Sequence, residues 1–357
     1  MNRNDARIRP ARRFGAVRQA RWASEGSAVE NIRLIYEQID TAKSHLLRGT
    51  SLDCRLALIL LDNAAELLIH RALLDRFSFD DHFKRHERPG RLKYTAQERA
   101  AAQREFEPKL RIVGFRLGLI SPSDRAVLKV CHRLRCEAFH AGTLRRTILA
   151  HAVSLLFRTT VGLTVRLPAR FFALPAPTPA EEDSRFLQRF ELQDAMILAL
   201  DEGRADIANK LLEGVVLDRI AFADTLSGDL VQRIDEHIVG GLEYLADHRH
   251  AEIDRNLQYT QFWRDMGISL AESGVREPDL EDSFRQWKAD GKAKYTLRRI
   301  HGWRRQAIAI ARCGEPATAI DRWWAIDSRI QPLEADIGEA VAEFDDWVNA
   351  EIHSRRS

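Results

Sequence analysis

The sequence lacks the features that mark membrane-spanning, secreted and metal-stapled proteins. No apolar run approaches the roughly eighteen residues that a membrane-spanning helix requires, and the N-terminal segment has no apolar stretch suited to a secretory signal. The cysteines form no CxxC pair and show none of the spacings of small disulfide scaffolds: Cys54, Cys131, Cys136 and Cys313. These absences predict a cytoplasmic protein with reduced thiols and no membrane contact.

Several catalytic signatures are also absent. No GxxxxGK[ST], GxGxxG, HExxH or GxSxG occurs, so nucleotide hydrolysis, zinc proteolysis and serine hydrolysis have no support. No convincing strand and no repeat of fixed period is found. The 357 residues, 45% of them hydrophobic, are enough for a real core. We expect an all-α protein: a helical bundle in the N-terminal half, followed by a second all-helical domain, either a bundle or a short array of helical pairs.

The net charge of +3 conceals a strong asymmetry along the chain. Residues 1–22 hold seven Arg and one Asp, a net charge of +6, and are expected to form a mobile basic arm, a targeting peptide or an over-extended start. Residues 23–167 carry a net charge of +8, and the remainder carries −11. Arg outnumbers Lys by 46 to 9, which a GC-rich genome produces in both halves alike. The difference in sign therefore indicates that the N-terminal half attracts a polyanion, whereas the C-terminal half does not.

Helical signals follow one another through the N-terminal half. Ser27 and Glu30 form a capping box that opens the first helix. The apolar segment 51–77 predicts a helix at the centre of a bundle, and the charged residues 78–94 predict a loop. The later signals are a capping box at Thr95 and Glu98, a break at Pro108, an N-cap and first turn at Ser121 and Pro122, a stop at Gly142, and an apolar helix over 143–165.

The segment from Pro168 to Pro179 holds four prolines and predicts a linker over 168–180, between domains at 23–167 and 181–357. Only helices are expected beyond it, with Pro332 kinking or splitting the last one. The expected helices are 183–201, 204–226, 229–247, 250–273, 296–312 and 317–350. The pair Trp323 and Trp324, together with Trp303 and Trp347, is expected in the core of this acidic domain.

An Arg-x4-His pair, Arg135 and His140, lies in the helix that reads HRLRCEAFH at 132–140. With 46 Arg and 12 His in 357 residues, about 1.5 such pairs arise by chance, and two occur, the other being Arg146 with His151. The pair alone therefore carries no information. Its weight comes from its position at the end of a basic helix that another apolar helix follows.

The segment HRLRCEAFHAG resembles the signature of HEPN domains, which are helical bundles with an Arg, usually a polar residue, and a His a few positions later. The earlier stretch LLDNAAELLIHRAL is similar to the long first-half helix of that family, with Glu66 as its acid. The resemblance covers roughly residues 27–165. It implies a metal-independent endoribonuclease without a cofactor, of prokaryotic toxin or antiphage-defence type, acting as a homodimer, with an antitoxin or regulatory protein as a further partner.

Two positions depart from the family's pattern. Cys136 stands where the family usually has Asn, Asp or His, and a thiol is a poor hydrogen-bonding substitute. Gly142 stands where some HEPN toxins carry a Tyr that a partner enzyme modifies, so that form of control is not expected. The first departure bears on catalysis and the second on regulation.

Cleaving RNA through its own 2′-OH requires a base, an acid and a cation for the phosphorane charge. His140 is the candidate acid or base and Arg135 the candidate phosphate clamp. Five residues apart, they differ by about 140° around a helix and about 7.5 Å along it, so they do not point at one spot. Arg133 lies nearly on the face of His140, as do Cys136 and Glu137, and these are candidate supporting residues. The resemblance implies that dimerisation completes the site.

Four other interpretations remain open. Arg135 and His140 can be an ordinary surface Arg and a helix-terminal His, and Glu66 a satisfied structural acid. Cys136 and His140 have the spacing of half a zinc site, although no second pair is evident. The domain can be a non-catalytic module that binds RNA or protein. The chain can also be a helical interaction scaffold, in which the acidic C-terminal half docks on a basic partner or on its own basic half.

Overall fold

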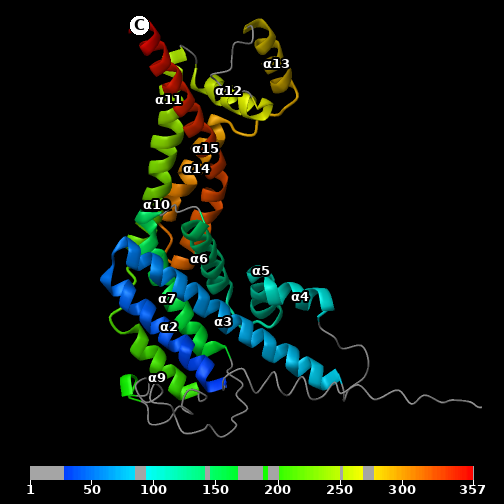
Figure 1. Cartoon of the computed structure of the whole chain (residues 1–357), viewed down its shortest axis with the longest axis vertical. Coiled ribbons are helices and arrows are strands. Elements are labelled where there is room, and N and C mark those ends of the chain that lie inside the picture. The colour runs from blue at the N-terminus through cyan, green and yellow to red at the C-terminus, as the bar shows by residue number, and fades with distance from the viewer. Residues whose placement is uncertain are drawn as a thin grey trace, which may run out of the picture.

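In a computed structural model of the protein, the residues that the structure describes are 28–84, 94–140, 145–167, 188–191, 201–249, 252–267 and 277–356. Every regular element among them is a helix and none is a strand, which confirms the all-α prediction. The predicted arm at 1–22, the Ser27–Glu30 capping box and the predicted linker at 168–180 lie outside the described part of the chain. The molecule is elongated, with two groups of helices stacked along its long axis (Figure 1).

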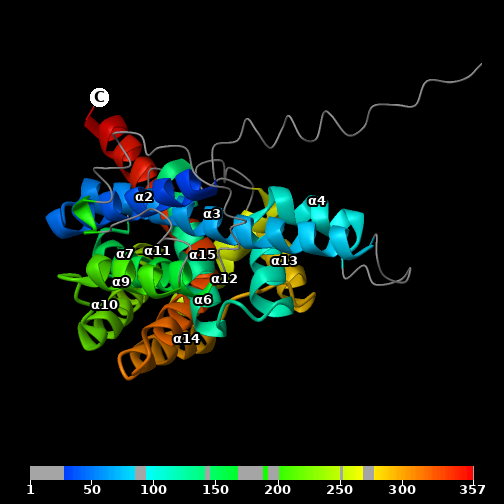
Figure 2. The same cartoon turned by 90° about the horizontal axis from the view of Figure 1, so that it is seen from below.

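The first group of helices surrounds α3, which packs on α2, α6 and α7. Its four main helices are α2 (Ala28–Arg48), α3 (Ser51–Lys84), α6 (Pro122–His140) and α7 (Arg146–Arg166). The largest fully buried side chains of this group include Tyr36, Ile39, Leu58, Leu61, Ile69, Leu73 and Phe157. A central α3 is what its nearly continuous apolar sequence predicts. From beyond the predicted linker, α9 (Asp201–Leu212) packs on α7 and α2, as seen from below in Figure 2.

The helix starts of this half follow the predicted caps. Thr95 accepts a hydrogen bond from the Glu98 amide, and the Glu98 carboxylate accepts one from the Thr95 amide. The Ser121 hydroxyl accepts from the Asp124 amide and starts α6 at Pro122. The short elements between are α4 (Ala96–Arg104), α5 (Phe106–Leu110) and the π-helix η1 (Arg111–Arg116). The predicted end of α3 at Phe77 is wrong, because the helix continues to Lys84 and no Gly or Pro interrupts 78–84.

The second group of helices is built on α15, which runs for 41 residues, about 60 Å at helical rise. Its members are α10 (Arg219–Gln232), the π-helix η3 (Arg233–Val239), α11 (Gly240–Arg249), α12 (Ile253–Met266), α13 (Glu277–Ala289), α14 (Leu297–Ile310) and α15 (Pro316–Arg356). The predicted split at Pro332 is absent, since α15 continues through it. Ile330 and Leu333 beside it are fully buried, and this packing offsets the lost backbone hydrogen bond.

The predicted helix over 204–226 is wrong as a single element. Gly214 adopts a φ of 76° after α9, a left-handed conformation that glycine adopts without strain. Asp218 then caps α10 by accepting hydrogen bonds from the amides of Ile220 and Ala221, both at 3.0 Å. The apolar periodicity continues through this break and therefore did not reveal it.

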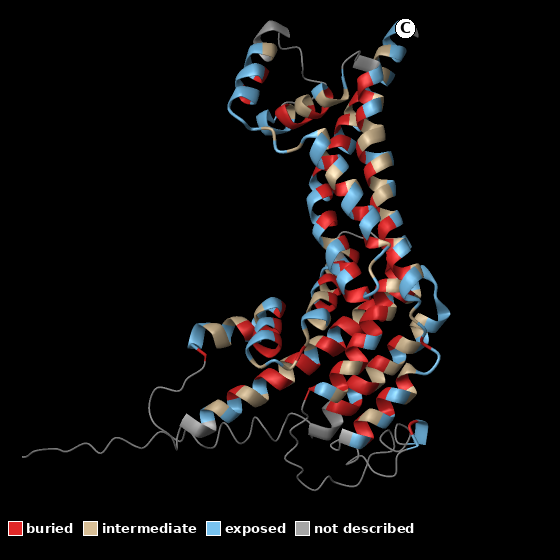
Figure 3. Ribbon diagram, turned by 180° about the vertical axis from the view of Figure 1, so that it is seen from behind, coloured by how far each residue is buried: buried red, intermediate tan, exposed pale blue. Residues whose placement is uncertain are grey.

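The two groups of helices share one apolar core that extends from Ile32 to Ile337. Figure 3 shows the buried residues continuing from one group into the other, where α15 contacts α6 and α10 contacts α7. Trp303 and Trp323 are buried as predicted, whereas Trp347 is 53% exposed, so its predicted place in the core is wrong. The prediction that no apolar run approaches the length of a membrane-spanning helix is wrong, because Thr147–Arg166 is long and apolar enough. Two-thirds of its apolar window is buried in the bundle, as in a core helix.

Candidate functional site

The candidate site lies where the C-terminal half of α6 crosses α3. Buried apolar residues at helical spacing fix the orientation of α6: Val127, Val130, Leu134 and Ala138. Between them, polar residues of HRLRCEAFH emerge on two different sides of the helix. One side meets α3 and the other meets α15, and α5 contacts both, through Phe106 on the first side and Glu107 on the second.

On the α3 side, a carboxylate, an imidazole and a thiol form a chain of polar contacts. Both carboxylate oxygens of Asp62 lie 3.1 Å from Nδ1 of His132, and Nε2 of His132 lies 4.0 Å from Sγ of Cys136. The Asp62 side chain is only 5% exposed. The His132 ring stacks on Phe106, with centroids 4.1 Å apart. An ionised carboxylate only accepts, so Nδ1 of His132 donates to Asp62, and Nε2 of the same ring faces the thiol.

Arg135 occupies the outer edge of the same side. Its Nε is 3.8 Å from a carboxylate oxygen of Asp62, and its guanidinium lies 5.3 Å from the centroid of the Phe139 ring. The Arg135 side chain is 32% exposed and Phe139 is 56% exposed. Among the described residues, Nε of Arg135 has no hydrogen-bond partner. Arg135 is therefore oriented by charge and by a ring, and about a third of its side chain remains exposed to solvent.

His140 is the last residue of α6, and its side chain lies outside the described part of the structure. It follows Cys136 by four residues and Arg133 by seven, so helix geometry places its Cα between the rows that these two residues occupy. The position of the backbone is thus known. The structure does not test whether the imidazole meets Arg135.

Arg133 and Glu137 lie on the other side of α6. Arg133 donates to Glu107 at 3.3 Å and lies 5.6 Å from the Trp324 ring of α15. Burial raises the pKa of Glu107, but the hydrogen bond from Arg133 and the charge of Lys129 outweigh burial and hold that pKa below its usual value. Glu137 accepts a hydrogen bond from Nε of Arg145 at 3.1 Å. The structure thus separates Arg133 and Glu137 from Cys136, although all three are within a few residues of one another.

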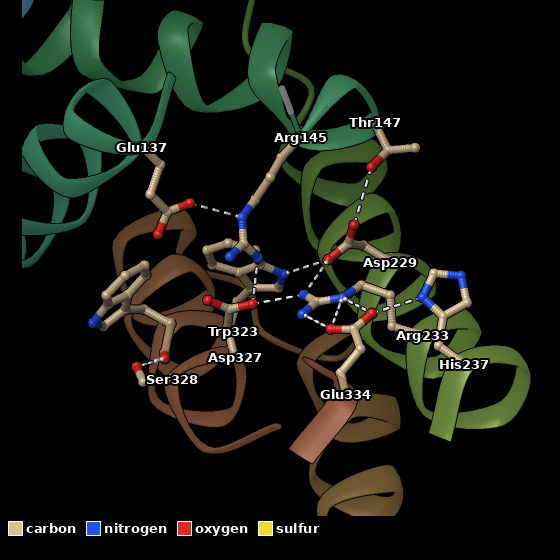
Figure 4. A network of polar contacts seen from close by, with 11 residues as sticks. Glu137, Arg145, Thr147, Asp229, Arg233, His237, Trp323, Asp327, Ser328 and Glu334 are labelled. Carbon is tan, nitrogen blue, oxygen red and sulfur yellow. Dashed lines mark hydrogen bonds and ion pairs between the residues drawn. The ribbon is translucent and has the colours of Figure 1, made fainter. Parts of the chain in front are cut away.

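Figure 4 shows Arg145 between Glu137 of α6 and the second group of helices. Arg145, the residue before α7, also donates to Asp327 of α15, which is fully buried. Its guanidinium lies 5.1 Å from the Trp323 ring. The Trp323 indole donates to Asp229 of α10 at 3.0 Å. The end of α6 is therefore connected to the C-terminal half by hydrogen bonds between charged side chains.

A second guanidinium completes this network. Arg233 of η3 donates to Asp327 at 2.6 Å and also to Glu334, which in turn contacts Nδ1 of His237 at 2.6 Å (Figure 4). Burial raises the pKa of Glu334, but the hydrogen bonds from Arg233 and His237 outweigh burial and lower it overall. Two guanidinium groups thus share the one buried carboxylate of Asp327. We call this set of residues, Glu137, Arg145, Asp229, Arg233, Trp323, Asp327 and Glu334, the junction network.

Glu66, the expected acid of α3, pairs with Lys109 of α5, whose side chain is only 6% exposed. Its role in the structure is therefore to neutralise a buried lysine. Asp62, one turn earlier on α3, is the carboxylate that meets α6 instead. The sequence contained a signal for this residue, because Asp62 is a charged residue inside the apolar run of α3. Nothing in the sequence pairs His132 with a carboxylate 70 residues earlier.

Within the part of the chain that the structure describes, no group of three or more His, Cys, Asp or Glu side chains is arranged to hold a metal ion. No known protein family, curated protein or solved structure matches this chain. What the protein can do chemically therefore follows from the arrangement of its own residues.

Proposed function

We propose that the protein is a cytoplasmic, metal-independent endoribonuclease of HEPN type, whose RNA site is the C-terminal end of α6. The observation that best supports this proposal is the pair formed by Arg135 and Phe139 on the outer edge of the α3 side. A cation that is about one-third exposed, beside an exposed ring, offers a phosphate contact next to a surface on which a base stacks. His140 follows Phe139 directly in the sequence.

The proposed chemistry uses the RNA's own nucleophile. A base takes the 2′-OH proton, the 2′ oxygen attacks the adjacent phosphorus, and the 5′ oxygen leaves with a proton, which produces a 2′,3′-cyclic phosphate. His140 is the acid or base, and Arg135 stabilises the charge on the phosphorane. Because a single histidine does not readily serve both proton transfers at once, a second copy of the chain supplies the other, as the expected homodimer implies.

The test is incubation of purified full-length protein with single-stranded RNA in the presence of EDTA, with product ends analysed for 2′,3′-cyclic phosphate. We expect the His140→Ala variant to lose at least about 100-fold in cleavage rate, the usual contribution of general acid–base catalysis. His301→Ala is the matched control, since His301 is exposed on α14. Cleavage that His140→Ala leaves unchanged would refute the assignment.

A second candidate function is RNA binding without cleavage. The observation in its favour is that the thiol of Cys136 faces the His132 imidazole and supplies no strong hydrogen-bond donor toward a phosphate. This function predicts salt-sensitive RNA binding that His140→Ala preserves, with no cyclic phosphate formed. The same pair of variants therefore distinguishes the two candidates.

We further propose that the C-terminal half restrains or senses the RNA site through the junction network. Arg145 contacts Glu137 of α6 and Asp327 of α15, so a movement of α15 changes the contacts that Arg145 makes with α6. An antitoxin or regulatory protein that binds the C-terminal half would act through these contacts. Whether the chain also acts as a scaffold is tested by sedimentation of the full chain at low and high salt, because charge-mediated association weakens with salt.

A further inference from the structure

Cys136 differs from the other cysteines of the chain in what surrounds its sulfur. Its Sγ lies 4.0 Å from Nε2 of His132, and Nδ1 of the same ring is held by the Asp62 carboxylate at 3.1 Å. This is the order of groups that activates a nucleophile: the nucleophile, a base within reach of its proton, and a third group that orients the base. The residues come from α6 and α3, two helices that pack directly on each other.

The geometry points to a modification site, and we propose that Cys136 is a reactive thiol that forms a mixed disulfide with a small-molecule disulfide. Asp62 keeps the proton on Nδ1 of His132, so the lone pair of Nε2 is directed at the thiol. Cys136 is partly exposed. A small disulfide can therefore reach a sulfur whose proton has an acceptor already in place.

The other cysteines lack this combination. Cys54 and Cys131 are buried, and burial, reinforced by a neighbouring aspartate, raises the pKa of both thiols. Cys313 is partly exposed like Cys136, and its sulfur lies 3.3 Å from the Arg322 guanidinium, a cation that favours a thiolate by its charge but cannot accept the proton. Cys313 is therefore an internal reference of similar exposure that has a neighbouring charge but no base.

The proposed step balances as a thiol–disulfide exchange. His132 takes the proton of the Cys136 thiol, the thiolate attacks one sulfur of the disulfide R–S–S–R, and the bond between the two sulfurs breaks. The products are the mixed disulfide of Cys136 with R–S and a free R–SH, which receives the proton from His132. The small disulfide is the oxidant, and one of its sulfurs is reduced to the thiol.

The consequence for function rests on the proposed RNA site. Cys136 adjoins Arg135 in the sequence and lies one helical turn before His140. A bulky adduct on this sulfur would occupy space beside the phosphate clamp and disturb the His132–Asp62 pair that also faces Arg135. Disulfide exchange at Cys136 would therefore switch off RNA binding, and a reducing agent would restore it.

The experiment treats the full chain with glutathione disulfide and follows each cysteine by peptide mass spectrometry. We expect Cys136 to react at least about tenfold faster than Cys313, and His132→Gln to remove this advantage. Asp62→Asn is a second variant that weakens the orientation of the base. Modification of the buried Cys54 and Cys131 reports unfolding of any variant, so loss of reactivity is separated from loss of structure.

Equal rates at Cys136 and Cys313 in the wild type would overturn the proposal, as would a Cys136 rate that both variants leave unchanged. These readouts need no RNA, so they stand or fail independently of the proposed ribonuclease. RNA binding is then measured before and after modification, with the Cys136→Ser variant as the chain that cannot form the adduct. RNA binding that the adduct at Cys136 does not weaken would refute the switch while leaving the reactive thiol established.

Discussion

The two sides of α6 hold similar residue types in different surroundings. On the α15 side, Arg145 and Arg233 converge on Asp327, a carboxylate with no exposed surface. On the α3 side, His132 and Arg135 converge on Asp62, but their side chains remain 23% and 32% exposed. Arg145 and Arg233 are only 15% and 14% exposed, so Asp327 and its neighbours neutralise cations that water hardly reaches, whereas His132 and Arg135 keep more of their surface in contact with solvent.

This difference separates a structural role from a functional one. A buried carboxylate shared by two guanidinium groups holds two groups of helices together, because removing it leaves two cations poorly solvated. A carboxylate at the edge of the core orients an imidazole and a guanidinium without enclosing them. We therefore expect Asp→Asn to act mainly on stability at position 327, and on both stability and RNA binding at position 62.

The largest expected effect is on stability, from Asp327→Asn. Loss of the negative charge leaves Arg145 and Arg233 without their shared acceptor, and we expect the free energy of unfolding to fall by about 3 kcal/mol. Urea denaturation followed by circular dichroism measures this. Asp321→Asn is the matched control on an exposed position of α15. An equal response of the two variants would contradict the structural role of Asp327.

The Asp62→Asn variant is the counterpart on the α3 side. Because His132 and Arg135 retain access to solvent, we expect a smaller loss in the free energy of unfolding, about 2 kcal/mol, together with weaker RNA binding. Fluorescence anisotropy with labelled single-stranded RNA measures the second quantity. If Asp62→Asn reduced stability more than Asp327→Asn while RNA binding stayed intact, the contrast between the two sides would be reversed.

A comparison of the two arginines tests which side meets RNA. We expect Arg135→Ala to weaken RNA binding by about tenfold and Arg133→Ala by about threefold or less, since Arg133 is engaged by Glu107 and lies over Trp324. The measurement is affinity at two salt concentrations, because phosphate contacts weaken with salt. Equal losses of RNA affinity in the two variants would show that Arg133 contributes to the RNA site as much as Arg135 does.

The smallest expected effect is the pH dependence of the junction network. The pKa of Glu334 in the folded protein is below its ordinary value of 4.5, so the stabilisation is fully present above that pH and is lost as the pH falls through the folded value. We expect the free energy of unfolding of wild type to exceed that of Glu334→Gln by about 1 kcal/mol at neutral pH, and this difference to shrink in acid. Glu202→Gln, at an exposed position of α9, is the control. A difference that acid leaves constant would contradict this role.

Much of the fold was predictable because it depends on local signals. The Thr95–Glu98 capping box and the Ser121–Pro122 start act within one turn, and both appear as predicted. The errors occurred where packing overrides a local rule. Proline at 332 is tolerated because its neighbours are buried, and Trp347 is exposed because Phe344, not Trp347, is the residue of this stretch that packs on Leu245 of α11.

The sequence by itself determined the helical class, the asymmetry of charge and the identity of α6 as the helix to examine, since composition and periodicity are properties of the chain alone. Only the tertiary structure decided which residues share a site. Asp62 meets His132 across 70 positions, and Arg145 meets Asp327 across 182. Helical periodicity does not predict these pairings. They form when helices pack and exclude water from charged side chains, which then require partners of opposite charge.

Arg133, which was expected beside His140, contacts Glu107 and lies over Trp324. Cys136, expected to be a weakness of the motif, faces a base.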